Sequence, residues 1–372
     1  MDPGFRRDDE DRPCRSVIEL DRAGTVSITY RIPTKQVLRV ITSIRQHRLM
    51  LSLGGATVIT ALLSLTIGSQ PLPLLQALQE SFGEKPGVYS LILTELRIPR
   101  TLVALLAGAS LGLCGAVMQS LLRNPLASPG LVGSASGAAL GAVITLYFGV
   151  AGLFAFALPL GGMAGALLAT LTVYLLAGRD GGTLTLILAG VAVNAFALAL
   201  VSLLLNLAPS PYAVQEIALW MLGSLANVSR NELWILLPGT LLGWLLVWRQ
   251  GRPLDLLTLG EETASSMGAD LPNLRRRLFL AVALAVGSAI SVTGAIGFIG
   301  LVVPHLLRPL VGYQPSRLLI PSAMGGALLL MLADMGVRLL PVQGEIKVGV
   351  VTSLIGAPFF LWLILHHRGR GI

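Results

Sequence analysis

The chain has 372 residues, of which 54% are hydrophobic and only 12% are charged, and its formal net charge is +8. A soluble domain carries roughly 25% charged residues, so this composition excludes a soluble globular protein and indicates a polytopic helical membrane protein. The arginines lie in short segments between apolar runs, as the positive-inside rule requires, so the net charge does not indicate nucleic-acid binding.

Residues 1–48 form the predicted N-terminal tail, in which residues 1–30 mix charges with few periodic apolar positions. Such a composition is typical of a disordered tail. No apolar core follows the first charges, so the segment does not resemble a signal peptide. Basic residues before the first span place the N-terminus in the cytoplasm. They are Arg31, Lys35, Arg39, Arg45 and Arg48.

The predicted transmembrane domain covers residues 49–366 and is all-α, with about ten helical spans. The spans are expected at 49–68, 98–121, 131–149, 152–177, 184–207, 231–249, 277–294, 299–312, 318–340 and 347–365. The glycine-rich GAIGFIG at 294–300 is expected to hold a short broken helix. An even number of spans places both termini in the cytoplasm, and the predicted C-terminal tail, residues 367–372, carries Arg368 and Arg370.

The stretch at 97–133, RIPRTLVALLAGASLGLCGAVMQSLLRNPLASPGLVG, predicts a membrane hairpin with an arginine pair at one end. No charge occurs from Thr101 to Leu122, which is about enough helix to cross a ~30 Å hydrocarbon core. Glycines spaced by four and three share one helical face, where small residues let another helix approach closely. They are Gly108, Gly112 and Gly115.

The longest cytoplasmic loop is predicted at 251–277, GRPLDLLTLGEETASSMGADLPNLRRR. A short helix from Glu261 to Met267 is expected, because acids in the first turn suit the helix dipole. Gly268 is a natural helix stop. A helix held between two spans could receive force from a soluble partner, and the alternative is an ordinary amphipathic connector.

Several kinds of site are missing from the sequence. No G-x-x-x-x-G-K-[ST] motif occurs, so the chain does not bind ATP by a P-loop. No His/Cys cluster predicts a metal site, and the lone His305 is interpreted as structural. We therefore expect no catalytic residue and no cofactor on this chain.

Several long motifs occur in the order and spacing of one family. Besides 96–133 they are LGEETASSMGAD (259–270), GAIGFIGLVVPHLLRPLVG (294–312), LLLMLADMGVRLL (328–340) and VGVVTSLIGAPFFLWLI (348–364). Through them, residues 49–366 resemble the permease subunits of type II ABC importers for iron–siderophore complexes, haem and vitamin B12.

This resemblance implies ten helices per subunit and two copies side by side in the bacterial inner membrane. It also implies two ATPase subunits, which bind ATP and Mg²⁺, on the cytoplasmic face and a periplasmic substrate-binding protein on the other face. The loop motif matches the family's coupling helix. Gly260, Glu261, Ala264 and Gly268 are accordingly expected at the ATPase contact.

Three arginines match the family's outward-facing residues that meet glutamates of the binding protein: Arg97, Arg100 and Arg338. Carboxylates on a partner would explain positive charge on the outer side. The alternative for Arg97 and Arg100 is contact with lipid headgroups. For Arg338 it is an i,i+4 pair with Asp334.

The resemblance implies a cytoplasmic gate at two turns, which here contain Asn124, Leu126 and Thr183. The match at Thr183 is loose. Lys347 stands where the family usually has proline. It is expected to contact Glu345 or lipid headgroups, and the alternative is contact with an anionic substrate.

The expected function is ATP-driven import of a metal chelate. An iron–siderophore complex is the first expectation on family frequency, with haem or cobalamin as the alternatives. An ion-coupled secondary transporter is the remote alternative; it would need ionisable residues inside the spans, and Asp334 is the nearest candidate.

Overall fold

The computed structural model describes residues 15–20, 26–31, 34–68, 72–82, 87–154, 156–178, 182–340 and 346–368. It divides into two compact units, Met1–Ser52 and Leu53–Ile372, with the boundary inside the first helix. Glu345 and Arg370, which entered the sequence interpretation, lie outside the described residues.

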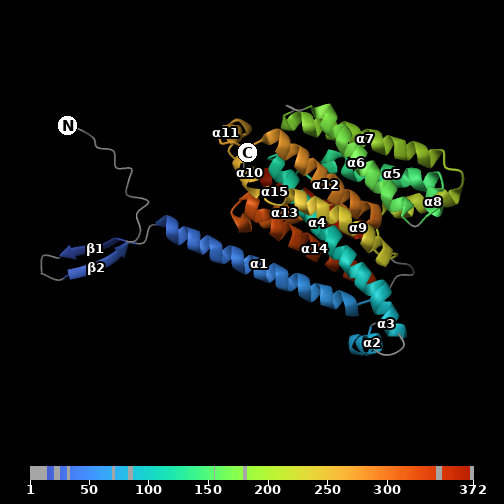
Figure 1. Cartoon of the computed structure of the whole chain (residues 1–372), viewed down its shortest axis with the longest axis horizontal. Coiled ribbons are helices and arrows are strands. Elements are labelled where there is room, and N and C mark those ends of the chain that lie inside the picture. Colours follow the sequence, from blue (N-terminus) through green and yellow to red (C-terminus); the bar gives the residue numbers. More distant parts are fainter. Residues whose placement is uncertain are drawn as a thin grey trace. The chain divides into compact units, whose positions relative to one another are not determined.

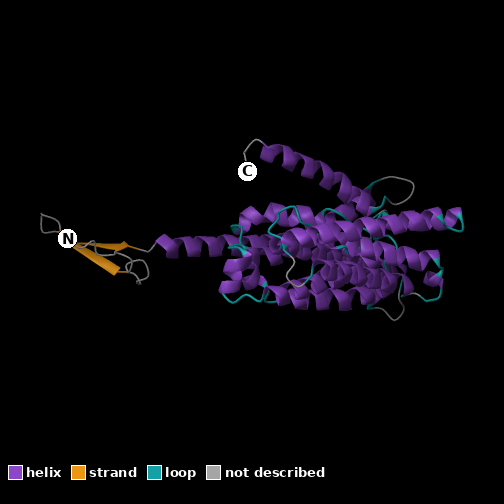
Figure 2. Ribbon diagram, turned by 90° about the horizontal axis from the view of Figure 1, so that it is seen from above, coloured by secondary structure: helices purple, strands orange, loops and turns teal. Residues whose placement is uncertain are grey.

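The N-terminal unit contains an antiparallel pair of strands, β1 (Arg15–Leu20) and β2 (Val26–Arg31). Ile18 lies opposite Ile28 in the register. The prediction of a disordered tail missed this hairpin, although VSITY alternates apolar with polar residues and both strands contain β-branched side chains. All described strands lie in this unit (Figure 2). Helix α1 (Thr34–Thr66) starts fifteen residues before the predicted first span.

The described residues of the C-terminal unit form helices and their connections (Figure 1). The helices are α2 (Leu74–Ser81), α3 (Val88–Leu91), α4 (Ile98–Leu121), α5 (Ser134–Tyr147), α6 (Ala157–Ala177), α7 (Thr183–Asn206), α8 (Pro211–Met221), α9 (Arg230–Val247), α10 (Gly251–Leu257), α11 (Glu261–Ser266), α12 (Leu271–Thr293), α13 (Ile299–Leu307), α14 (Pro315–Leu339) and α15 (Val348–Arg368).

The all-helical membrane fold is confirmed, and ten is an approximate count of its spans. Among the described residues, six helices are long and apolar enough to cross a bilayer, and the bent pair α9–α10 adds a seventh. Three shorter apolar helices occupy Ser134–Tyr147, Ile299–Val311 and Val348–Leu363. Each predicted span overlaps one of these helices, but three of them fall short of a full crossing length.

The second predicted span begins ten residues earlier than expected, at Val88. A π-helical turn at Ile92–Arg97 joins α3 to α4 just before Pro99. Proline cannot donate to the carbonyl one turn earlier and its ring crowds that carbonyl, so a wider turn lets the helix continue.

Helix α4 lies at the centre of the core and packs against α9, α12, α13 and α14 (Figure 1). Its glycine face is an interhelical contact, as predicted. A Cβ built on Gly108 would overlap the carbonyl oxygen of Gly326, and one on Gly112 would overlap that of Ser322, both on α14. On Gly115 it would overlap the carbonyl oxygen of Gly300 on α13. These backbones therefore touch, which only glycine permits.

Candidate functional site

Polar side chains gather at the two ends of α14. Near its first turn, Asp255 of α10 accepts from the backbone N–H of Ser316 at 2.8 Å and from Gln314 Nε2 at 2.9 Å. Near its last turn lie Asp334 and Arg338. At about 1.5 Å per residue, Ser316 and Arg338 are roughly 33 Å apart. We name these two regions the loop end and the arginine end.

Asp334 is the centre of the arginine end and is fully buried. Arg100 of α4 donates to it from Nη2 at 2.7 Å, to Oδ1, and from Nε at 3.1 Å to each oxygen. Arg338, one turn further along α14, donates from Nη2 to Oδ2 at 2.6 Å. Both oxygens of the carboxylate are thus held by guanidinium groups from two helices.

The last turn of α1 joins the same cluster. Arg338 Nη1 donates to the carbonyl oxygens of Ser64 at 2.9 Å and Ile67 at 3.0 Å, and its Nη2 donates to Ser64 Oγ at 2.6 Å. Arg97 Nη1 donates to the carbonyl oxygen of Leu65 at 3.2 Å. The arginine end therefore ties α1, α4 and α14 together.

The structure brings all three predicted docking arginines into one cluster around Asp334 and the last turn of α1. It contains the i,i+4 pair of Asp334 with Arg338 that the sequence suggested as an alternative. Sequence reasoning missed the pair of Asp334 with Arg100, which are 234 positions apart. One signal could have indicated this pair: Asp334 is an acid in an apolar span, at the membrane end where the arginines were expected.

A more exposed ion pair involves Glu95, which lies two residues before Arg97. Arg230, the first residue of α9, approaches Glu95 at 3.1 Å, and both side chains are about half exposed. Arg230 Nε also donates to the carbonyl oxygen of Thr94 at 3.2 Å. Exposed pairs of this kind contribute little to stability.

At the loop end, Glu261 begins the short helix α11. Its Oε2 accepts from Arg275 Nη2 of α12 at 2.7 Å, and its Oε1 accepts from the hydroxyl of Thr183 at 3.2 Å. Thr183 is the first residue of α7. The structure thus places a predicted coupling residue against a predicted gate residue, a contact across 78 positions that the sequence did not indicate.

The other predicted coupling residues shape α11. Gly260 and Gly268 bracket the helix with φ of +108° and +88°, a backbone region that favours glycine. Ala264 is fully buried and anchors the helix. The helix ends at Ser266, one residue before the predicted end.

Asn124 and Leu126 lie in the turn that follows α4. The Asn124 side-chain oxygen accepts from the backbone N–H of Leu126 at 2.9 Å, and Asn124 N–H donates to the carbonyl oxygen of Gln119 at 3.1 Å. These hydrogen bonds are local, and they fix the turn while the Leu126 side chain stays exposed.

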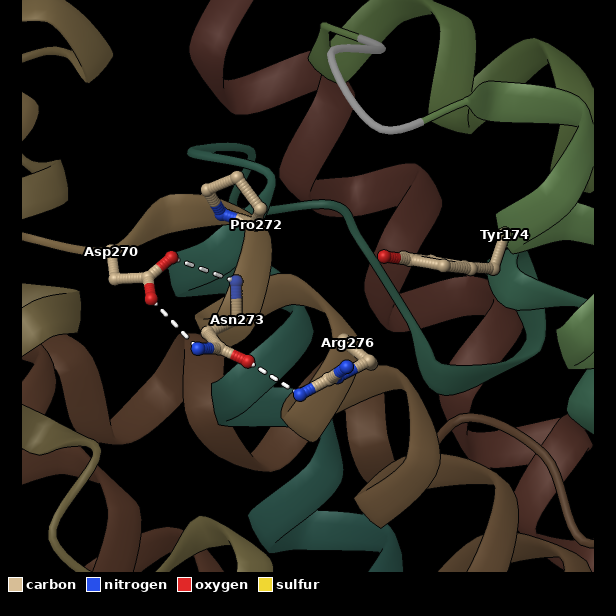
Figure 3. A pocket seen from close by; sticks show the side chains of 5 residues that line it. All are labelled: Tyr174, Asp270, Pro272, Asn273 and Arg276. Atoms are coloured by element: carbon tan, nitrogen blue, oxygen red, sulfur yellow. Dashed lines mark hydrogen bonds between the residues drawn. The ribbon is translucent and has the colours of Figure 1, made fainter.

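A cavity of about 690 Å³ opens where α11 leads into α12, lined by Tyr174, Asp270, Pro272, Asn273 and Arg276 (Figure 3). Asp270 accepts from the backbone N–H of Asn273 at 3.1 Å and from its Nδ2 at 2.7 Å, and Arg276 Nη2 donates to Asn273 Oδ1 at 2.6 Å. Tyr174 faces this chain of bonds from α6. The guanidinium of Arg276 and the hydroxyl of Tyr174 beside this open cavity can bind a polar or acidic side chain of a partner.

The hydrogen bonds from Asn273 hold the pKa of Asp270 below its ordinary value, and the nearby arginines lower that pKa further. The carboxylate caps the N-terminus of α12 in its charged form. This cap stabilises the helix above the ordinary carboxyl pKa, and its contribution is lost as the pH falls through the lowered pKa. The loop end should therefore keep its geometry at neutral pH.

Metal binding by the described residues has no geometric support. Among them, no group of three or more His, Cys, Asp or Glu side chains could hold a metal ion. His305 lies edge-on to the ring of Phe359, with centroids 6.5 Å apart.

Comparisons with known proteins cover nearly the whole helical unit. The model of the FecCD transport family matches residues 56–366. The vitamin B12 import system permease protein BtuC of Klebsiella pneumoniae is 40% identical over 336 residues, which cover 88% of this chain and 96% of that protein. BtuC of Salmonella paratyphi A is 39% identical over 327 residues, covering 86% and 96%.

A solved structure is similar over the same region. It is described as an inward-facing conformation of a metal-chelate type ABC transporter, and it superimposes with a TM-score of 0.77 at 31% identity. The match covers 86% of this chain and 99% of the other.

Proposed function

The chain belongs to the FecCD transport family, as a permease subunit of an ABC importer, and we propose that the cargo it carries is cobalamin. One observation supports this cargo most strongly: permeases named for vitamin B12 import are 39–40% identical to the chain over nearly their full length. The sequence-based expectation placed an iron–siderophore complex first and cobalamin among the alternatives. The relatives reverse that order.

We propose that two copies of this chain assemble with two ATPase subunits and a periplasmic binding protein. The separation of the two ends of α14, roughly 33 Å, is close to the ~30 Å thickness of a hydrocarbon core. This supports a position of α14 across the membrane. On the family resemblance, we place the loop end in the cytoplasm, beside the ATPases, and the arginine end in the periplasm. ATP and Mg²⁺ would then be bound by the partner subunits.

The arginine end is the proposed docking site of the binding protein. Its three arginines, gathered from α4 and α14, fit acidic side chains on a partner. The side chain of Arg100 is only 14% exposed and pairs with Asp334, which argues against the alternative that it extends to lipid headgroups.

Helix α11 is the proposed ATPase contact. Glu261 links it to the first turns of both α7 and α12, so a displacement of α11 would reach the predicted gate residue Thr183 directly. The polar cavity beside Arg276 offers a recess for a side chain of the ATPase. We propose Asn124, Leu126 and Thr183 as gate residues on the resemblance alone.

Replacing Glu261 by Arg is expected to uncouple ATP hydrolysis from transport. The new guanidinium would face Arg275 and lose the hydrogen bond from Thr183, so α11 would no longer be held to α7 and α12. Uptake should fall about tenfold or more, a loss equivalent to about 1.4 kcal/mol in the rate-limiting barrier, while ATPase activity persists.

The matched control is Glu262→Arg, because Glu262 is the exposed neighbour in the same turn. It changes the charge of α11 equally without touching the contact of Glu261. Unchanged uptake by the Glu261 variant, or equal losses in both variants, would contradict the proposed role of Glu261.

The proposed function is tested in liposomes that contain this permease and the ATPase encoded with it. The binding protein is added after loading with cobalamin, ferric siderophore or haem. ATP-dependent uptake of cobalamin supports the proposal. Uptake of ferric siderophore or haem alone would contradict cobalamin as the cargo but would be consistent with an ABC importer. Uptake that follows an ion gradient and does not depend on ATP would favour a secondary transporter.

A further inference from the structure

The arginine end contains an acid that the proposed function does not use. Asp334 is fully buried, although burying a carboxylate is costly unless its charge is paired. Here both oxygens accept hydrogen bonds, from Arg100 of α4 and from Arg338 of α14. The pairing is therefore complete, and it joins two helices that are distant in the sequence.

We propose that Asp334 is a positioning residue for docking of the binding protein: it holds the guanidinium groups of Arg100 and Arg338 together at the arginine end. This inference rests on the proposed docking function. Two guanidinium groups repel each other, and a single carboxylate between them offsets that repulsion. The bidentate geometry on Arg100 also fixes the orientation of its planar group.

Ser64 supports the same arrangement from α1. Its hydroxyl accepts from Arg338 Nη2 at 2.6 Å and lies 2.8 Å from the Thr101 hydroxyl, and its carbonyl oxygen accepts from Arg338 Nη1. Arg338 is thus held from two sides, by Asp334 and by the last turn of α1. Because Ser64 is uncharged, its substitution changes the positioning of Arg338 without changing the charge of the arginine end.

Two hypotheses, one based on net charge alone and one based on positioning by Asp334, predict opposite changes in docking affinity for Asp334→Asn. If the arginine end acts only through its net charge, removing the carboxylate makes that end more positive and tightens docking of an acidic partner. If Asp334 positions the arginines, its loss lets Arg100 and Arg338 separate and docking weakens. The sign of the change in affinity therefore decides between the two.

The experiment measures the affinity of the binding protein for the permease–ATPase complex in nanodiscs, by biolayer interferometry at several salt concentrations. Asp334→Asn is expected to weaken docking about tenfold or more, since one partner of a buried charged pair is lost. The matched control is Glu95→Gln, which removes one negative charge from the exposed pair with Arg230. This control should leave docking unchanged or slightly tighter.

A second variant guards against misfolding. Ser64→Ala alters no charge and is expected to weaken docking in the same direction by a smaller factor. Assembly with the ATPase and the elution volume of the complex report folding for every variant. If Asp334→Asn assembles and docks as tightly as the parent or more tightly, or if Asp334→Asn fails to assemble and Ser64→Ala docks normally, the inference is overturned.

Failure of this inference is distinguishable from failure of the proposed docking site. If glutamate at Arg97 and Arg100 leaves docking intact, the arginine end is not the docking site. If that double variant loses docking while Asp334→Asn does not weaken it, the docking site stands and only the positioning role of Asp334 is wrong.

Discussion

Replacing Arg97 and Arg100 together by glutamate is expected to abolish docking of the binding protein and to leave assembly with the ATPase subunits intact. Two positive charges at the arginine end would be replaced by two negative charges. An acidic partner that fits the parent surface would then be repelled, and we expect affinity to fall on the order of 100-fold or more. Cobalamin uptake in liposomes should fall with it.

The measurement is binding of the loaded binding protein to the permease–ATPase complex in nanodiscs. The matched control is Arg230→Glu, since Arg230 pairs with the exposed Glu95 and donates to the carbonyl oxygen of Thr94. That control removes positive charge near the site but should retain most of the affinity. Docking of the double variant at parental strength would contradict the proposed outer face.

Replacing Gly112 by Leu is expected to disrupt the contact between α4 and α14. A side chain at this position would meet the backbone of Ser322, which cannot rotate away as a flexible side chain can. Overpacking typically costs about 1–3 kcal/mol, and a rigid obstacle places this variant at the upper end. We expect the melting temperature of the purified protein to fall on the order of 5–10 °C or the protein not to assemble.

Gly336→Leu is the matched control on α14. A Cβ at Gly336 would meet nothing within 4 Å, and the position is exposed. The same substitution there should leave the melting temperature near the parental value, because leucine has the higher helix propensity. Equal destabilisation by both variants would mean that the small-residue face is not the reason for the effect.

Features that depend on local pattern could be predicted from the sequence. The apolar runs indicated the ten predicted spans, because about 20 apolar residues satisfy both the bilayer and the backbone. The spacing of Gly108, Gly112 and Gly115 indicated a close contact, and Gly268 indicated the end of a short helix. The pair of Asp334 with Arg338 was visible as an alternative because it lies within one turn.

Features that depend on tertiary contacts could not be predicted in this way. The pairs of Arg100 with Asp334 and of Thr183 with Glu261 each join helices that the sequence keeps far apart. The π-helical turn before Pro99 was missed because a proline is normally interpreted as a helix start. The hairpin of β1 and β2 was missed because its charged surroundings favoured disorder.

The contacts at the two ends of helix α14 couple binding at one end to binding at the other. It is one continuous helix, held by Asp255 of α10 at its first turn and by Arg100 of α4 near its last. A ligand at either end that favours one position of α14 must change the affinity at the other end. Linkage makes this effect reciprocal, so the binding protein should alter ATPase affinity by the same factor by which the ATPase alters binding-protein affinity.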